Sequence, residues 1–231
     1  AGRVTYTSYP KRTQAEINEG VHQQYDSLGR PTVTGTISEL GTIFSGYNYE
    51  AGFKTNYSNG RSFSTKYSYQ VFDEPSEAAV SDYTAPEGMT VVIARDEFGK
   101  PLSITRSGGG KSATRSYVYN VNELLCKTIE PETSATVQTF DAANNVSWRA
   151  SGLALPSTTS CDDASVLGAS KITYGYDSLN RLLSTTFGDN SPAISRTYTG
   201  DGLPLTVTSN GAAWTYGYNK RRLNTRESLV Y

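Results

Sequence analysis

A six-residue sequence motif, which we call the phrase, recurs in this chain and restricts the folds that the chain can adopt. Residues 25–30 read Tyr-Asp-Ser-Leu-Gly-Arg, and residues 176–181 read Tyr-Asp-Ser-Leu-Asn-Arg. Weaker copies lie at residues 95–100, 140–145 and 198–203. A phrase that returns at a regular interval indicates a repeat architecture, in which similar units stack on their neighbours. The pattern therefore favours a protein built by stacking over an enzyme with one central pocket.

The interval between copies is about 20–22 residues. We take the Asp of each phrase, or the residue in its place, as an anchor; the anchors are Asp26, Asp96, Asn120, Asp141, Asp177, Thr199 and Asn219. From Asp96 onward the steps are 24, 21, 36, 22 and 20 residues, so the long step predicts an insertion near residues 153–170. We predict a single repeat region over residues 1–231, irregular over 1–89, where 47–52 is a degenerate unit, and more regular over 90–231.

Each copy has the features of a β-hairpin. Before the anchor, aromatic residues alternate with others, as in Tyr174-Gly175-Tyr176, and a period of two is typical of a strand. Asp and Asn favour the first position of a turn. The third residue after the anchor usually tolerates a left-handed backbone; these residues are Gly29, Gly99, Asn144, Asn180 and Gly202. Glu123 and Arg222 stand at that position in two copies, and we expect those two turns to differ.

The composition agrees with an all-β chain and excludes some functions. Hydrophobic residues make up 36% of the chain, and 17 of them are Tyr, whose ring and hydroxyl suit half-buried surfaces. Helical turns are expected only at 13–19 and 75–80. A net charge of −1 offers no basis for capturing nucleic acid or an anionic membrane, and no apolar run reaches the ~20 residues of a membrane span. Ala1 and the single methionine, Met89, lead us to expect a piece of a longer protein.

The phrase Tyr-Asp-x-x-Gly-Arg at this spacing resembles the RHS, or YD, repeat family. The two best copies carry Tyr25, Asp26, Gly29 and Arg30, and Tyr176, Asp177, Asn180 and Arg181. Looser copies carry Asp96, Gly99, Asp141, Asn144, Tyr198, Gly202 and Tyr218. The resemblance covers most of residues 90–231 and is patchier before them.

The resemblance implies a fold, a role and partners. In this family a strip of β-hairpins forms a continuous, spiralling antiparallel sheet, and the resulting shell encloses a toxic C-terminal domain or its equivalent. The family occurs in bacterial polymorphic toxins, insecticidal toxin complexes and teneurin-like cell-surface proteins. The implied role here is a non-catalytic section of shell wall in a secreted or surface protein of a bacterium. Its partners would be the rest of the parent polypeptide or further copies at open sheet edges, and a toxin cargo. Family members that release their cargo use an Asp-Pro segment, which this chain lacks, so autoproteolysis is not implied.

Several short patterns resemble chemical sites, and each has a simpler interpretation. Residues 107–112 imitate a phosphate-binding loop, but a strand is expected after them, so we predict a hairpin turn. His22, the sole histidine, has no nucleophile motif to serve. Glu130 and Glu132, and the pair Asp162-Asp163, are interpreted as loop charges. We therefore predict no catalytic residue, no cofactor and no metal site.

Two alternatives remain open. Cys126 and Cys161 lie 35 positions apart and fit no metal motif, so they form either a disulfide or two buried thiols. For function, the alternatives to a shell wall are a filament subunit that assembles by edge-strand addition and a Tyr-rich module that binds carbohydrate or a cell surface.

Overall fold

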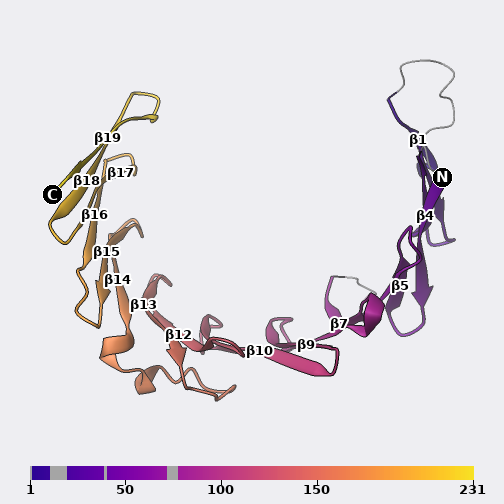
Figure 1. Cartoon of the computed structure of the whole chain (residues 1–231), viewed down its shortest axis with the longest axis horizontal. Coiled ribbons are helices and arrows are strands. Elements are labelled where there is room, and N and C mark those ends of the chain that lie inside the picture. The colour runs from indigo at the N-terminus through magenta and orange to yellow at the C-terminus, as the bar shows by residue number, and fades with distance from the viewer. Residues whose placement is uncertain (1, 11–19, 39–40, 72–77) are drawn as a thin grey trace. The chain divides into compact units, whose positions relative to one another are not determined.

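The structure is a computed structural model that describes residues 2–10, 20–38, 41–71 and 78–231. Within them the chain is all-β, and each strand pairs antiparallel with the next along the chain (Figure 1). The predicted sheet of consecutive hairpins is confirmed. The helical turn expected at 13–19 lies outside the described residues, as do residues 75–77 of the second; Val80 begins a strand. The chain divides into two compact units, Ala1–Thr114 and Arg115–Tyr231, which we describe separately.

The first unit contains nine described strands and the start of a tenth. Its strands are β1 (Tyr6–Ser8), β2 (Gly20–Tyr25), β3 (Pro31–Ser38), β4 (Gly41–Glu50), β5 (Lys54–Ser58), β6 (Ser64–Tyr69), β7 (Val80–Thr84), β8 (Thr90–Arg95) and β9 (Pro101–Gly108), with a 3₁₀ turn η1 (Pro86–Gly88). Tyrosine rings pack across the strands, with centroids 4.9 Å apart for Tyr47 and Tyr57 and 5.7 Å apart for Tyr67 and Tyr83. Such cross-strand pairs stabilise a sheet face by a few tenths to ~1 kcal/mol each.

The second unit begins within β10 (Lys111–Tyr119). Its other elements are β11 (Leu125–Glu130), β12 (Ser134–Phe140), β13 (Val146–Leu153), η2 (Asp163–Ser165), η3 (Gly168–Ser170), β14 (Ile172–Tyr176), β15 (Leu182–Phe187), β16 (Ile194–Tyr198), β17 (Pro204–Ser209), β18 (Ala212–Tyr218) and β19 (Asn224–Val230). The predicted insertion is the connection between β13 and β14, residues 154–171. Its Val166 packs on Val137 and Ala150 of the sheet, and this cluster is the buried core of the unit.

The pairing within each hairpin shifts by one residue beside the predicted turn. In β14–β15, for example, Gly175 pairs with Ser184, whereas Tyr176 pairs with Leu182, so Leu183 is extra. Equivalent shifts precede the turns after β2, β8, β10, β12, β16 and β18. A bulge of this kind bends the strand and re-aims neighbouring side chains. The bulge therefore points the side chain of the residue before each anchor in a direction that regular strand pairing would not allow.

Pairing between successive hairpins of the second unit is short at two junctions. β13 and β14 share two residue pairs, and so do β15 and β16, whereas β14 and β15 share five within their hairpin. Backbone hydrogen bonds alone therefore hold these hairpins together less firmly than they hold each hairpin internally. Contacts at the turn edge of these two junctions are described below.

Candidate functional site

The repeat turns share one backbone geometry. At Asp177, the anchor N–H donates to the Arg181 carbonyl at 3.0 Å, and the Asn180 N–H donates to the Asp177 carbonyl at 3.0 Å. The same two bonds occur at the six other predicted anchors. The third residue after the anchor is left-handed in all seven turns, including Glu123 (φ 63°) and Arg222 (φ 64°). The expectation that these two turns differ is wrong, because the surrounding bonds impose the geometry whatever the residue.

The anchor side chain closes the turn. One carboxylate oxygen of Asp177 accepts the N–H groups of Leu179 and Arg181, each at 2.9 Å. Asp96, Asn120, Asp141 and Asn219 accept the equivalent pair of N–H groups. Thr199 replaces the carboxylate with its hydroxyl, which accepts from Leu203 at 2.9 Å. The anchors are thus turn-closing acceptors, one to each hairpin, which explains why the residue recurs.

The tyrosine before the anchor joins its hairpin to the preceding one. The Tyr176 hydroxyl donates to the Val146 carbonyl at 3.1 Å, and the Tyr198 hydroxyl donates to the Leu182 carbonyl at 2.9 Å. Both acceptors are the first residue of the second strand in the hairpin before. These bonds lie at the two junctions where strand pairing is shortest. We call this bond the inter-hairpin staple.

Other residues make the staple where the tyrosine is missing. Phe140 stands in the tyrosine position of its repeat, and there the Gln138 side-chain amide donates to the Leu125 carbonyl at 2.8 Å. In the first unit Arg95 stands in the tyrosine position and donates to the Val80 carbonyl at 3.4 Å, whereas a tyrosine, Tyr49, makes the staple to the Pro31 carbonyl at 3.0 Å. A hydroxyl, an amide and a guanidinium therefore serve the same acceptor position.

The basic residue at the end of the phrase reaches both its own turn and the next hairpin. Arg181 donates to the Asp177 carboxylate at 2.6 Å, and its guanidinium lies 4.8 Å from the centroid of the Tyr198 ring. Arg30 makes the same ion pair with Asp26 and lies 3.9 Å from the Tyr49 ring centroid. A guanidinium over an aromatic face is attracted by the ring quadrupole. Tyr, Asp, Gly and Arg of the phrase thus each have a defined structural contact.

The closed turns favour the ionised form of their carboxylates. The Arg181 backbone N–H, opposed by partial burial and assisted by the Arg181 guanidinium, holds the pKa of Asp177 below its ordinary value. The Arg30 backbone N–H does the same for the pKa of Asp26. Hydrogen bonds donated to a carboxylate stabilise its charge, so the turns are built for the ionised side chain.

The insertion is fixed to the sheet by a disulfide and an ion pair. Cys126 and Cys161 are bonded, and Lys127, whose side chain is fully buried, donates to the Asp162 carboxylate and, at 2.7 Å, to the Ser157 carbonyl. Cys126 is the extra residue of the bulge beside the Asn120 turn, so both it and Lys127 face the insertion. From the sequence, Cys126 and Cys161 could form either a disulfide or two buried thiols, and Lys127 was not identified as a structural residue. Its position next to Cys126 is the only feature of the sequence that could have indicated this role.

The other patterns noted in the sequence have structural roles. Residues 107–112 form the predicted hairpin turn, with Gly109 (φ 58°) and Gly110 (φ 73°) at its tip. The exposed His22 ring lies 4.6 Å from that of Tyr6, and Glu130 pairs with Arg115 at 3.1 Å. Over the described residues, no group of three or more metal-ligating side chains gathers, and no helix is long and apolar enough to cross a membrane. Two further turns, Asn59–Phe63 and Ala85–Met89, make the same two backbone bonds and were not predicted, because neither carries a Tyr-Asp pair.

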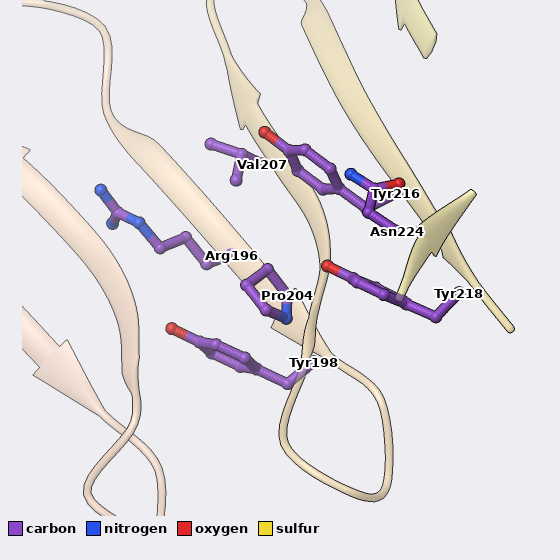
Figure 2. A pocket seen from close by; sticks show the side chains of 7 residues that line it. All are labelled: Arg196, Tyr198, Pro204, Val207, Tyr216, Tyr218 and Asn224. Carbon is purple, nitrogen blue, oxygen red and sulfur yellow. The ribbon is translucent and has the colours of Figure 1, made fainter. Parts of the chain in front are cut away.

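A pocket of about 470 Å³ lies among the last two hairpins. It is lined by Arg196, Tyr198, Pro204, Val207, Tyr216, Tyr218 and Asn224. Figure 2 shows the hydroxyl ends of Tyr216 and Tyr218 pointing toward the strand that carries Pro204 and Val207. Tyr198 and Tyr218 belong to the predicted repeat motif; nothing in the sequence indicated that they would border one concave surface.

Comparison with solved structures relates the fold to part of TcdB2-TccC3. No protein-family model and no curated sequence matches the chain. Among solved structures, TcdB2-TccC3-TEV matches with a TM-score of 0.64 at 11% identity, and TcdB2-TccC3-Cdc42 with 0.64 at 10%. TcdB2-TccC3 without its hypervariable C-terminal region matches with a TM-score of 0.58 at 11% identity. These matches cover 91%, 91% and 87% of this chain but 11% of each of those chains. At such identities the likeness establishes a shared fold, over a small part of the larger proteins.

Proposed function

We propose that this chain is a section of an RHS/YD-repeat shell, which encloses and shields a toxin or another C-terminal cargo of a secreted bacterial protein. The observation that carries the proposal is the inter-hairpin staple, because at five junctions one hairpin donates to a carbonyl of the one before, and each acceptor is the first residue of a strand. Such a unit has no intrinsic limit on length, and its stability grows by nearest-neighbour contacts. The fold shared with TcdB2-TccC3 over 91% of the chain supports the same role.

The proposed role is architectural, with no chemical step. The phrase residues are engaged in turn closure, staples and ring contacts, as Asp177 and Tyr176 illustrate. The partners we propose are the continuing parent polypeptide or further copies, added at sheet edges whose backbone groups invite another strand. The location we propose is outside the bacterial cell or at its surface.

The test is the state of the natural protein and the protection of what it encloses. Intact mass and light scattering should show this sequence inside a much larger chain, whose region following the repeats resists protease. Replacing both staple tyrosines, Tyr176→Phe with Tyr198→Phe, should make that region cleavable at a lower denaturant concentration than in the parent. A 25.1 kDa chain that forms open-ended polymers would instead support the filament, and a stable monomer of that mass would support a binding module.

A further inference from the structure

Four tyrosines of the first unit take no part in the repeat contacts described above, and they meet as two pairs of rings. Tyr47 of β4 lies opposite Tyr57 of β5, with ring centroids 4.9 Å apart. Tyr67 of β6 lies opposite Tyr83 of β7, with ring centroids 5.7 Å apart. Tyr57 also pairs in register with Thr65, two residues before Tyr67, so all four rings lie on one face of the sheet.

The hydroxyl groups of these four tyrosines have no role in the fold. Within the part of the chain that the structure describes, they make no hydrogen bond, whereas Tyr49, Tyr176 and Tyr198 each use the hydroxyl in a staple. Contact with water does not account for them, because the same unit places phenylalanine at a more exposed position: Phe44 is 60% exposed and Tyr47 is 37% exposed. What the hydroxyl adds to such a ring is easy one-electron oxidation, a property that phenylalanine lacks.

We propose that the pairs Tyr47–Tyr57 and Tyr67–Tyr83 are sites of oxidative cross-linking, at which each pair becomes a dityrosine. The oxidant is hydrogen peroxide activated by a haem peroxidase, which removes one hydrogen atom from each phenol. The two phenoxyl radicals couple through a new carbon–carbon bond between ring carbons ortho to the hydroxyls. The hydrogens displaced from those carbons move to the oxygens, so both rings regain their aromaticity. The two abstracted hydrogen atoms reduce one molecule of peroxide to two molecules of water.

The sheet holds each pair in a position that favours coupling. Directly opposed residues of an antiparallel pair keep their Cβ atoms about 4.5–5.5 Å apart, so the rings meet without a change of fold. Holding two reactive groups together turns a bimolecular step into an intramolecular one. All four residues are also partly exposed, so an oxidant can act on them in the folded protein. Tyr47–Tyr57 has the shorter separation, and we expect it to react first.

The cross-links are independent of the proposed shell function, because they use side chains of the first unit alone and require no cargo. Each bond would join two neighbouring strands in the part of the chain where the phrase is least regular. A covalent bond between strands restricts the unfolded chain and so stabilises the folded sheet. Oxidation would thus strengthen the unit that carries the fewest close copies of the phrase.

The test is oxidation of the purified chain at low concentration with hydrogen peroxide and a haem peroxidase, followed by isolation of the monomer. We expect dityrosine fluorescence and an intact mass lowered by two hydrogen atoms for each bond. A glutamate-specific protease cuts after Glu50 and Glu77, so the two bonds join different peptides. The first bond should join 40–50 to 51–77, and the second should join 51–77 to 78–87.

Single substitutions by phenylalanine keep the ring and remove the reactive hydroxyl. Tyr57→Phe should lower the yield of the first bond roughly tenfold or more and leave the second, and Tyr83→Phe should do the reverse. Tyr174→Phe, at a half-buried tyrosine of the other unit, should leave both yields unchanged. Circular dichroism establishes that each variant is folded.

Three results would overturn the proposal. One is an oxidised monomer without either bond. Another is a first bond that survives Tyr47→Phe or Tyr57→Phe, since a different tyrosine of the same peptides would then be the partner. The third is coupling governed by exposure alone, which would join separate chains through Tyr231, 93% exposed, and leave the paired rings unreacted.

Discussion

Removing the disulfide between Cys126 and Cys161 should destabilise the second unit by about 4 kcal/mol. The bond closes a segment with a sequence separation of 35. In the chain-entropy description, a loop of that size restricts the unfolded state by about 12.7 cal/mol/K, or ~3.8 kcal/mol at 25 °C. The insertion keeps its Lys127–Asp162 ion pair and the packing of Val166 when the bond is absent, so we expect it to remain docked near neutral pH.

The assay compares thermal unfolding of the parent with that of the double variant Cys126→Ala, Cys161→Ala. For about 4 kcal/mol we expect the melting temperature to fall by on the order of 10 °C. A reducing agent should lower the melting temperature of the parent by a similar amount and leave the double variant unchanged. Two outcomes would refute the reasoning: a loss below ~1 kcal/mol, or equal sensitivity of parent and variant to the reducing agent.

Three further predictions concern the repeat turns. Tyr176→Phe should cost about 1 kcal/mol and lower the melting temperature by a few degrees, since a partly buried carbonyl loses its donor, whereas Tyr174→Phe on the same strand serves as the unaffected control. Because the pKa of Asp177 is lowered in the folded state, its contribution to stability is present above the ordinary carboxyl pKa of ~4 and is lost as the pH falls through the lowered value. Thermal melts from pH 7 to pH 2.5 should therefore show stability falling below about pH 4, and falling less steeply in Asp177→Asn. Identical pH profiles for the two proteins would contradict this. Glu123→Gly should raise the unfolding free energy by roughly 0.5–1 kcal/mol, because relief of the strained left-handed backbone outweighs the added entropy of the unfolded state. Gly99→Ala, at the same turn position, should lower the unfolding free energy. A change of the same sign in both variants would count against a shared turn geometry.

The hairpins and their spacing could be predicted because they depend on local chemistry. A turn-closing acceptor, a residue that tolerates positive φ and alternating aromatics are readable within six residues, as in the copy at Asp177. Glu123 shows the limit of that reasoning, since its φ of 63° is imposed by bonds from Asn120 and Leu124 that favour the turn more than Glu disfavours it. The conformational preferences of residues predict which residue usually stands at a turn position. They do not predict the backbone geometry of that position when a different residue stands there.

Two features could not be predicted, because each depends on residues far apart in the sequence. They are the disulfide and ion pair that fix the insertion to the sheet, and the pocket. Lys127 pairs with Asp162 across a separation of 35 residues, and it lies beside a one-residue shift in strand pairing that no local sequence pattern predicts. Tyr218 lines the pocket, and the hairpin before it carries Leu203 where two other copies of the phrase carry Arg30 and Arg181. A substitution in one hairpin thus alters the surroundings of a ring in the next, which only the assembled sheet reveals.

The staple explains how the fold tolerates extensive sequence change. A staple needs only a donor near the end of one strand and a free carbonyl at the start of another, and a carbonyl belongs to every residue. Tyr176, Gln138 and Arg95 meet this requirement with three different functional groups. The turn likewise accepts Asp, Asn or Thr at its anchor. A repeat specified by backbone acceptors can therefore keep its architecture at 10–11% identity to TcdB2-TccC3, a level at which side-chain identity carries little trace of the fold.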